Sequence, residues 1–196
     1  MNLQFIQLEG AHVRLDPVTP ADKDELRATL DCDPEGWEIM SVNGCGEGFD
    51  DWWGEMQGQS QRGERMCFLI RRQDDNVCIG TSSYLSIRRL HKGLEIGATF
   101  IRPEARSSPI NPESKRLMLE HAFDAGAIRV EFVVDVRNAR SQAAVEKLGA
   151  TKEGVLRNHK ITWTGYVRDS AIFSITDYEW PGVRQRLDFR LSEDFV

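Results

Sequence analysis

LEIGATFIRPEARSSPIN, residues 94–111, is an apolar strand-like run that passes through a short polar loop into the start of a helix. The run over 94–101 has the length and composition of a buried strand. Asn111 can cap the helix that follows, and Pro112 suits its first position, where the N–H that proline lacks would have no partner. We therefore predict a helix over 111–124.

The companion stretch, residues 128–150, reads IRVEFVVDVRNARSQAAVEKLGA. Apolar and polar side chains alternate over 128–136, which predicts a strand. Asn138 can then cap a helix over 139–148, and Gly149 suits the residue that ends it. Two units in which a strand leads directly into a helix therefore follow each other along the chain.

The remaining elements follow from apolar patterning and from the turn residues between the apolar runs. Residues 31–48 are rich in Gly, Asp and Pro, which predicts a loop. No repeat or linker divides the chain, so we expect a single domain over residues 1–196 and a mixed α/β class. The other predicted strands are 12–16, 65–72, 77–88, 151–161 and 167–176, and the other predicted helices are 21–30, 49–61 and 178–191.

Composition narrows the possible partners and the compartment. The formal net charge is -6, so the chain gains no general attraction to a phosphate backbone, and we expect no nucleic-acid partner. The start of the chain lacks a basic segment followed by a long apolar stretch, and no apolar run could span a bilayer. This predicts no membrane partner and a cytoplasmic protein. The cysteines form no C-x-x-C pair, and no histidine lies at zinc-like spacing to them, so we expect no metal site.

Together the two stretches resemble the GNAT superfamily of N-acetyltransferases. In that family a strand leads into a Gln/Arg-x-x-Gly-x-Gly/Ala loop and helix, and a second strand leads into Asn…Glu-Lys-x-Gly-Phe. Here the loop begins at Arg106, the asparagine is Asn138, and Glu146-Lys147-Leu148-Gly149 follows. The segments that are similar to the RimJ/RimL branch, the ribosomal-protein N-terminal acetyltransferases, are Leu8-Glu9-Gly10, Val13-Arg14-Leu15, Asn111-Pro112-Glu113 with Lys115, Arg129-Val130-Glu131, residues 153–157, Arg168-Asp169 and residues 178–181.

The resemblance implies a GNAT fold, with a central, twisted, mixed but mostly antiparallel sheet of about seven strands, helices on both faces and a splayed central strand pair. It implies acetyl-CoA as a cosubstrate, and direct transfer of the acetyl group to a primary amine in a ternary complex. The splayed strands would be 94–101 and 128–136, with free N–H groups that polarise the acetyl carbonyl. The residues that it implies for cofactor binding are Phe100, Ile101, Arg106, Ser107, Ser108, Ile110, Asn111, Asn138, Arg140 and Ser141.

For catalysis the resemblance implies a carboxylate base and a proton donor for the departing CoA thiolate. Glu95 is similar to the acidic residue that many members carry in this strand, and Glu131 and Asp135 on the next strand are alternatives. In many members the proton donor is a tyrosine seven residues after the asparagine, where this chain has Val145. Ser141 shares a helix face with Val145 and is the substitute that we predict.

Departures from the family pattern leave other interpretations open. Pro109 stands where the first loop glycine is expected, and Ser107 stands where this branch often has another. The loop therefore binds a pyrophosphate less tightly, or it uses the hydroxyls of Ser107 and Ser108 instead. A catalytically inactive GNAT-fold module that binds CoA or another ligand is the second interpretation, and an α/β ligand-binding domain without CoA is the third.

The sequence does not choose the acceptor. The acceptor pocket would be formed by the variable loops around 31–63 and 157–168, and these fit either a protein N-terminus or a small-molecule amine. The resemblance also implies a homodimer that pairs through the C-terminal strands and helix.

Overall fold

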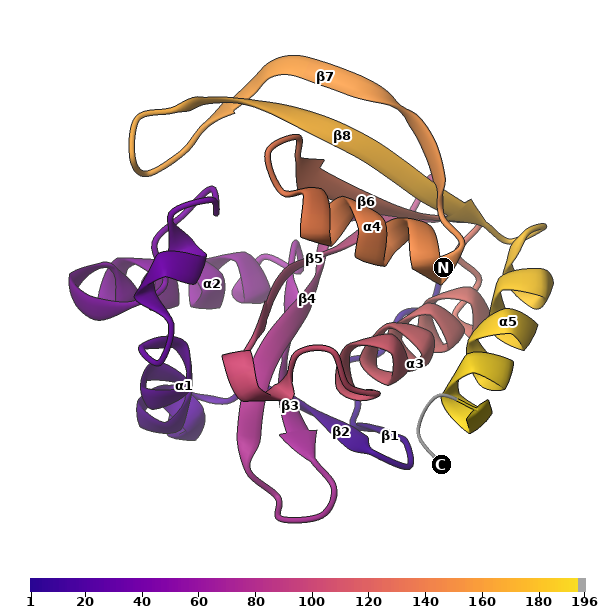
Figure 1. Ribbon diagram of the computed structural model, residues 1–196, viewed down its shortest axis with the longest axis horizontal. Helices are drawn as coiled ribbons and strands as arrows, with labels where there is room; N and C mark the ends of the chain where they lie inside the picture. Colours follow the sequence, from indigo (N-terminus) through magenta and orange to yellow (C-terminus); the bar gives the residue numbers. More distant parts are fainter. Residues whose placement is uncertain (194–196) are drawn as a thin grey trace.

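Eight strands form one sheet at the centre of the protein in the computed structural model, which describes residues 1–193 (Figure 1). Their order is β1-β2-β3-β4-β5-β6-β8-β7. Neighbouring strands are antiparallel except for β5 and β6, which are parallel. The strands are β1 (Leu8–Glu9), β2 (Val13–Pro17), β3 (Met66–Arg72), β4 (Cys78–Arg88), β5 (Gly93–Ile101), β6 (Arg129–Asp135), β7 (Thr151–Ile161) and β8 (Val167–Thr176).

Helices cover both faces of the sheet, while β7 and β8 form a long hairpin that arches above them (Figure 1). On one face the apolar side chains gather around Trp37 and Phe100, and on the other they form a larger cluster that includes Met118 and Phe173. The helices of the first face are α1 (Lys23–Leu30) and α2 (Phe49–Gln61), and those of the second are α3 (Ile110–Asp124), α4 (Ala139–Leu148) and α5 (Trp180–Glu193).

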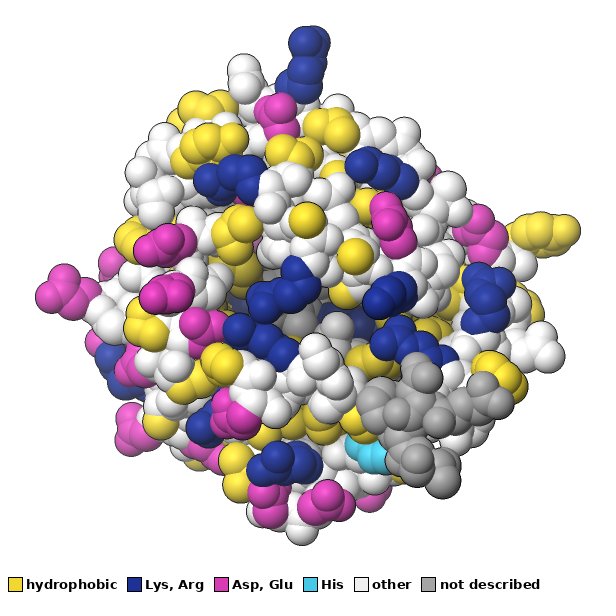
Figure 2. Space-filling model, viewed as in Figure 1, with side chains coloured by type: hydrophobic (Ala, Val, Ile, Leu, Met, Phe, Trp, Pro, Cys, Tyr) yellow, Lys and Arg dark blue, Asp and Glu magenta, His cyan; other side chains and the backbone are white. Residues whose placement is uncertain are grey.

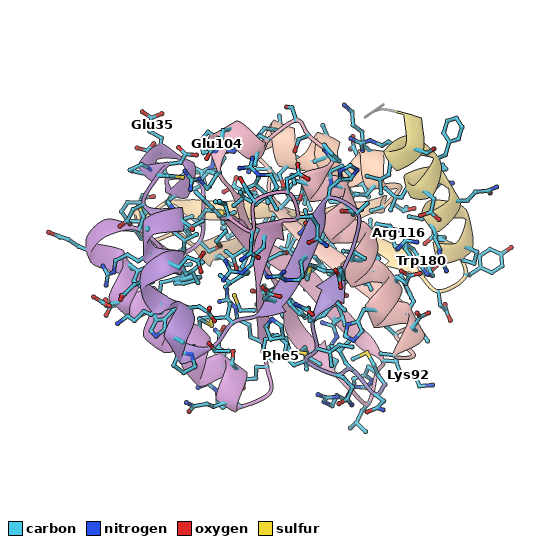
Figure 3. All side chains as sticks on the ribbon, turned by 90° about the horizontal axis from the view of Figure 1, so that it is seen from below. Phe5, Glu35, Lys92, Glu104, Arg116 and Trp180 are labelled. Carbon is cyan, nitrogen blue, oxygen red and sulfur yellow. The ribbon has the colours of Figure 1, made fainter. Side chains whose placement is uncertain are left out.

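Helices α3 and α5 pack against each other, with Arg116 and Trp180 at their contact (Figure 3). Arg116 Nε donates to Asp188 of α5 at 2.6 Å, and the ring of Trp180 stacks on Phe123 at 5.3 Å between centroids. Within residues 1–193, no helix combines the length and the apolar character that crossing a bilayer requires. The short 3₁₀ turns are η1 (Pro20–Asp22), η2 (Pro34–Trp37), η3 (Gly46–Gly48) and η4 (Pro103–Ala105).

The predicted mixed α/β class, the mostly antiparallel sheet and the helices on both faces are confirmed. The prediction of about seven strands misses β1, because a strand of two residues is too short to show an alternating pattern. The loop predicted over 31–48 contains two 3₁₀ turns, η2 and η3.

Two helices begin later than the sequence predicts. The helix predicted over 21–30 begins at Lys23, because the Asp22 carboxylate accepts hydrogen bonds from the amide and the hydroxyl of Thr19 and holds the preceding residues in η1. The helix predicted over 178–191 begins at Trp180. Here the Glu179 carboxylate accepts from the amide and the hydroxyl of Thr176, which holds 176–179 in a turn.

A bulge in β5 opens the sheet at its centre. Gly97 pairs with Ser83 of β4 and Phe100 pairs with Thr81, so β5 contains one more residue than β4 between these pairs. Ala98 in the bulge has a φ of 46°. A bulge bends its strand and increases the local twist. β5 and β6 accordingly pair only over 93–95 and diverge beyond Glu95, which confirms the splayed central pair.

Glu113 joins α3 to the first strands of the sheet. Its buried carboxylate accepts hydrogen bonds from the amides of Ala11, His12 and Val13, at 2.9, 2.7 and 2.8 Å. The approach is so close that a Cβ on Gly10 would lie 2.6 Å from the Glu113 carboxyl carbon. These three hydrogen bonds, which we call the Glu113 clamp, set the position of α3 and therefore the position of its N-terminus beside β5.

We predict that Glu113→Gln lowers the free energy of unfolding by about 3 kcal/mol, because an amide group cannot accept all the hydrogen bonds that the buried carboxylate accepts. Urea denaturation measures this change. Glu120→Gln on the same helix is the matched control: Glu120 pairs with Arg116 and Arg184 near the surface, so we expect a loss below about 1 kcal/mol. Equal losses in the two variants would contradict the clamp.

Candidate active site

The gap between β5 and β6 exposes backbone groups of β5. The amide of Arg102 donates to the carbonyl of Ile79 in β4. Because backbone groups alternate in direction along a strand, the N–H of Ile101 points away from β4 and into the gap, whereas that of Phe100 points toward β4. Of the two amides predicted to polarise an acetyl carbonyl, that of Ile101 has the required direction.

The facing edge of the gap belongs to β6. The amide of Val136 donates to the carbonyl of Asp169 in the segment of β8. By the same alternation, the backbone groups of Asp135 and Val133 face the gap. Two strand edges that do not pair with each other therefore face across the gap, and their amides suit an extended ligand that accepts backbone hydrogen bonds on both sides.

Glu95 lies at the last paired position before the strands diverge. Its side chain is buried, and its carboxylate forms no hydrogen bond or ion pair within residues 1–193. Burial raises the pKa of Glu95, and the nearby positive charge of Lys160 opposes this only in part. A carboxylate with a raised pKa is better matched to accept a proton near neutral pH.

The two alternative bases are engaged with cations. Glu131 pairs with Arg88 at 2.9 Å and with Arg129 at 2.8 Å. Burial raises the pKa of Asp135, but hydrogen bonds from the side chain and amide of Arg137 outweigh it, and the pKa is lowered overall. Of the three carboxylates that the sequence offers as a base, Glu95 is the one without a cationic partner.

Arg106 ties the loop before α3 to the loop after α1. Its Nε donates to the carbonyl of Ile101 at 2.9 Å, and its Nη2 forms an ion pair with Asp33. Figure 3 shows Glu35 of η2 and Glu104 of η4, the turns beside Asp33 and Arg106, at the same end of the molecule. The charge of Arg106, which the resemblance implies as a cofactor-binding residue, is thus paired with that of Asp33.

The two loop serines differ in what their hydroxyls contact. Ser107 is exposed and has a φ of 56°, a conformation that favours glycine. The Ser108 hydroxyl donates to the carbonyl of Ala105 at 2.6 Å and accepts from the amide of Ile110 at 3.3 Å. Ser108 therefore stabilises the loop itself, while the Ser107 hydroxyl is available to a ligand.

Helix α3 begins at Ile110, so the prediction that Asn111 caps it is wrong. Pro109 is the capping residue, and its carbonyl accepts the first helical hydrogen bond, from the amide of Glu113, at 2.9 Å. Asn111 instead lies within the first turn, where its side-chain oxygen is buried without a hydrogen-bond partner. Pro112 occupies the third helical position, where a missing N–H leaves no donor unpaired.

The start of α4 matches its prediction. The Asn138 side chain accepts a hydrogen bond from the amide of Ser141 at 2.9 Å, and Gly149 ends the helix with a φ of 96°. Val145 packs into the core, and Ser141 lies half-buried on the same face of the helix. Arg140 is exposed in the first turn.

Arg168 of β8 reaches across β6 toward the gap. Its side chain is only 6% exposed. Nη2 donates to the carbonyl of Val133 at 3.2 Å, and Nη1 donates to the hydroxyl of Ser41 at 2.9 Å. The sequence shows Arg168 only as part of a family motif. The pairing of Arg168 with Lys160 on β7, which places two cations opposite each other, is what distinguishes it, and this pairing is seen in the structure.

Lys115 is a second residue beside the gap whose position sequence reasoning did not predict. Its Nζ donates to the hydroxyls of Ser82 and Thr99, at 2.8 and 2.5 Å, and so connects α3 to the bulge of β5. Burial lowers the pKa of Lys115 to about 7. The sequence did contain a signal for this: Lys115 lies among apolar residues on the side of α3 that faces the core. A lysine in that position needs a polar partner.

Loop residues Trp37, Ser41 and Trp163 contact one another on the Glu95 side of the gap, and we call this group the roof. Trp163, at the tip of the β7–β8 hairpin, donates through Nε1 to the carbonyl of Trp37 at 2.8 Å and through its amide to Ser41 at 3.2 Å. The ring of Trp37 in turn stacks on Phe100 at 5.4 Å between centroids. The two loops predicted to form an acceptor pocket are therefore in contact.

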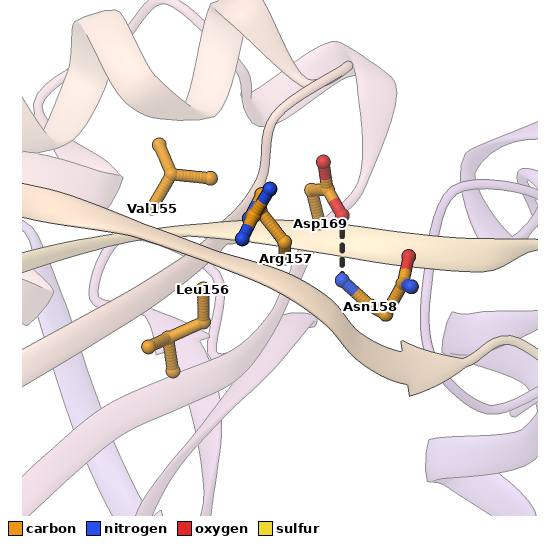
Figure 4. Close-up of a pocket in the computed structure, with 5 residues that line it drawn as sticks. All are labelled: Val155, Leu156, Arg157, Asn158 and Asp169. Carbon is orange, nitrogen blue, oxygen red and sulfur yellow. Dashed lines mark hydrogen bonds between the residues drawn. The ribbon is translucent and has the colours of Figure 1, made fainter.

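Two open pockets lie along the β7–β8 hairpin. One, of about 470 Å³, is lined by Glu38, Ile39, Arg137, Trp163 and Thr164. The other, of about 620 Å³, lies where β7 bulges against β8 (Figure 4). In it the Asn158 amide donates to Asp169 at 2.7 Å. Its lining residues are Val155, Leu156, Arg157, Asn158 and Asp169.

Positive charge gathers on one face although the chain is acidic overall. In the view of Figure 2, lysine and arginine side chains surround a hollow at the centre of the molecule. A concave basic region of this kind focuses a positive potential that attracts an anionic ligand. Within residues 1–193 there is no group of three or more His, Cys, Asp or Glu side chains that could hold a metal ion.

Comparison with known proteins identifies the family of this fold. A family model described as an acetyltransferase (GNAT) domain matches residues 12–151, which include the splayed strands and the starts of α3 and α4. The chain belongs to the GNAT acetyltransferase family. A GNAT relative, the uncharacterized N-acetyltransferase YoaA of Bacillus subtilis (strain 168), is 32% identical over 118 residues. That match covers 60% of this chain and 64% of YoaA.

Solved GNAT structures share the same fold. A GCN5-related N-acetyltransferase from Brucella melitensis superimposes with a TM-score of 0.89 at 24% identity, covering 99% of this chain and 89% of that one. Mycobacterium smegmatis RimJ, solved in complex with CoA-disulfide, superimposes with a TM-score of 0.77 at 21% identity, covering 90% of this chain and 88% of RimJ. At these identities the likeness shows the fold.

We predict that Ser107→Gly raises the free energy of unfolding by about 0.5–1 kcal/mol. Removing Cβ relieves the strain of the positive φ, and the greater freedom of glycine in the unfolded chain offsets part of the gain. Thermal or urea denaturation measures the change. Ser108→Gly is the matched control, and we expect it to lose about 1 kcal/mol with the hydroxyl bond to Ala105. Destabilisation by Ser107→Gly would contradict the strained loop.

The raised pKa of Glu95 predicts a pH-dependent gain in stability for Glu95→Gln. Because the folded state holds this proton more tightly than the unfolded state, wild-type stability falls as pH rises above the unfolded pKa of about 4.3. Glutamine, which stays neutral, avoids this loss. Urea denaturation should therefore favour Glu95→Gln over wild type more strongly at about pH 7 than at about pH 4.

Glu153 provides the control with the opposite sign. Its hydrogen bond from Arg129 lowers the pKa of Glu153 to about 2, so its ionised form stabilises the folded state above the unfolded pKa. Glu153→Gln should therefore lose stability near pH 7, and the loss should shrink as pH falls toward about 2. Parallel pH profiles for wild type and Glu95→Gln would show that Glu95 is not perturbed by burial.

Proposed function

We propose that this chain is an N-acetyltransferase that moves an acetyl group from acetyl-CoA to a primary amine by direct transfer. The observation that carries the proposal is the placement of Glu95, a buried and unpaired carboxylate at the mouth of the β5–β6 gap. Its raised pKa suits a general base. The family supplies the reaction class, and the site supplies the residue that accepts the proton.

The surroundings of the gap fit the cosubstrate. The amides of Ile101 and Val133, which face the gap, offer hydrogen bonds to an extended arm, and the buried side-chain oxygen of Asn111 lacks the donor that a ligand would supply. The N-terminus of α3, the exposed hydroxyl of Ser107 and the basic hollow suit phosphate groups (Figure 2). Acetyl-CoA would bring the acetyl group as a thioester.

In this proposal the residues beside the gap have different roles in the reaction. Glu95 accepts a proton from the acceptor ammonium, directly or through a water molecule, so that the amine nitrogen can attack the acetyl carbonyl. The Ile101 amide donates a hydrogen bond to the carbonyl oxygen as negative charge develops on it. The Ser141 hydroxyl is the proposed proton donor to the departing thiolate. Phe100 and Trp37, stacked beside this point, exclude water.

We place the chain in the RimJ/RimL branch, within a single domain over residues 1–196. The motifs at the start of α3 and at Arg168-Asp169 support this, and RimJ shares the fold over 90% of the chain. The acceptor is then a protein N-terminus or a small-molecule amine, and nucleic acid is not a partner. A reducing cytoplasm suits the cysteines, all of which are free thiols within residues 1–193.

A homodimer is part of the proposal. β7 is an edge strand of eleven residues that carries the exposed apolar side chains of Val155, Leu156 and Ile161. Phe189 on α5 is also exposed. Long apolar edges of this kind are usually covered by a partner, and a second copy would pair the C-terminal strands and helix.

The first test is calorimetric titration with acetyl-CoA and with desulfo-CoA, followed by turnover on peptide N-termini and small amines. We predict that Glu95→Gln lowers kcat/KM by about 10²–10⁴-fold and leaves the acetyl-CoA dissociation constant unchanged, because Glu95 acts on the acceptor. Glu131→Gln, which removes a carboxylate held by two arginines on the next strand, should retain most of the activity.

These binding and activity measurements distinguish the candidate bases from one another and an active enzyme from an inactive CoA-binding module. A loss of activity in Glu131→Gln or Asp135→Asn, with Glu95→Gln active, would assign the base elsewhere. Binding of acetyl-CoA without turnover on any amine would favour an inactive CoA-binding module. If acetyl-CoA does not bind, Pro109→Gly tests whether the loop is the cause, because it restores an N–H and allows closer approach of a pyrophosphate.

A further inference from the structure

Two basic side chains face each other across the last pair of strands. Lys160 of β7 and Arg168 of β8 are direct cross-strand partners. Opposite residues lie about 5 Å apart at their Cβ atoms, where like charges repel and destabilise a sheet. Lys160 forms no ion pair within residues 1–193, and Arg168 forms one long ion pair, with Asp135 at 3.8 Å. The protein itself therefore relieves the repulsion only in part.

The hydrogen-bond partners of Arg168 are all neutral. Nε donates to the hydroxyl of Ser170 at 2.9 Å, and the other two bonds go to the hydroxyl of Ser41 and the carbonyl of Val133. Burial lowers the pKa of Arg168, which shows that the charge is poorly compensated. A guanidinium carries more N–H donors than these three bonds use, so Arg168 has donors left for a ligand.

The carboxylates around Arg168 do not balance its charge. Asp135 accepts hydrogen bonds from Arg137 on both oxygens, at 2.8 and 3.0 Å. Glu131 is held by arginines of its own. Glu95 is close enough for its charge to act on Arg168, but it forms no hydrogen bond with it. Two carboxylates, those of Asp135 and Glu95, are therefore shared among Arg137, Arg168 and Lys160, which leaves an excess of positive charge on this side of the gap.

This charge lies next to the reacting centre. The carbonyl of Val133, to which Arg168 donates, faces the β5–β6 gap, and Glu95 senses the charges of both Lys160 and Arg168. Ser41, also bound to Arg168, belongs to the roof over this side of the gap. A ligand that brings an anionic group beside Glu95 would remove the repulsion between the two cations.

We propose that Arg168 and Lys160 bind a carboxylate carried by the amine acceptor, so that the preferred substrate has a carboxylate close to its ammonium group. This inference rests on the proposed function, because it names the acceptor of the same site. Arg168 would position the acceptor through charge-assisted hydrogen bonds, while the exposed Lys160 would attract it from solution. The carboxylate has two possible sources: the α-carboxylate of a free amino acid, or an acidic side chain at the start of a peptide.

The test compares matched acceptors that differ only in this charge. Leucine and leucinamide form one arm, and the C-terminally amidated tripeptides Asp-Ala-Ala and Asn-Ala-Ala form the other. Each probe is titrated calorimetrically into the protein saturated with CoA, and kcat/KM is then measured with acetyl-CoA. In the arm that matches the natural source we expect the carboxylate form to bind at least about tenfold more tightly than its neutral partner.

Substitutions at Arg168 and Lys160 test whether these two residues cause the preference for a carboxylate. Arg168→Met and Lys160→Met should each reduce the ratio between charged and neutral probes at least about threefold, and Arg168→Lys should retain part of the ratio. Lys160→Met guards against misfolding, because this side chain is exposed and forms no ion pair within residues 1–193. Lys152→Met, which removes the same charge from the opposite face of β7, is the matched control and should not change the ratio.

Three results would overturn the inference: equal affinity of charged and neutral probes in both arms, binding of no probe in either arm, or a preference that survives in Arg168→Met and Lys160→Met. Failure of the proposed function is separate and shows as absence of acetyl-CoA binding, or as acetyl-CoA binding without turnover on any amine. In that event the probes are titrated into the free protein, where the same ratios decide whether the two cations bind a carboxylate.

Discussion

The bulge in β5 is the constraint on which the site depends. Ala98 adopts a positive φ, a conformation that costs energy for a residue with a side chain, and the extra residue turns β5 away from β6. Lys115 reaches up from α3 to Ser82 and Thr99 beside the bulge and holds this geometry. Without the turn, β6 would continue to pair with β5, and no backbone groups would be free to meet a ligand.

The opened strands bring two helix starts to one place. α3 is fixed from behind by Glu113, which binds the amides before β2, and α4 is fixed by the cap that Asn138 forms. A helix N-terminus carries partial positive charge, so both ends favour anionic or polar ligand groups beside the gap. The clamp and the cap therefore link the stability of the fold to the geometry of the site.

Charge pairing distinguishes the carboxylates around the gap. Glu131 and Asp135 have arginine partners, whereas Glu95 is buried without a hydrogen bond or ion pair within residues 1–193, and Arg168 is buried with one long ion pair, to Asp135. Buried charges of this kind reduce stability unless a ligand compensates them. Both groups lie at the mouth of the gap, and buried, incompletely compensated charges in a cleft are typical of functional sites.

The sequence by itself determined the elements and the family, because apolar patterning, caps and loop motifs act over a few residues; α2, α4, β7 and β8 have the predicted bounds. It did not place the start of α3, where Asn111 and Pro112 imitate a cap that Pro109 provides. Only the tertiary structure decided which of the three carboxylates is unpaired and that Arg168 reaches the gap. The burial and pairing of these side chains depend on residues that lie far apart along the chain, such as Arg168 and Ser41. Such residues come together only when the sheet has formed.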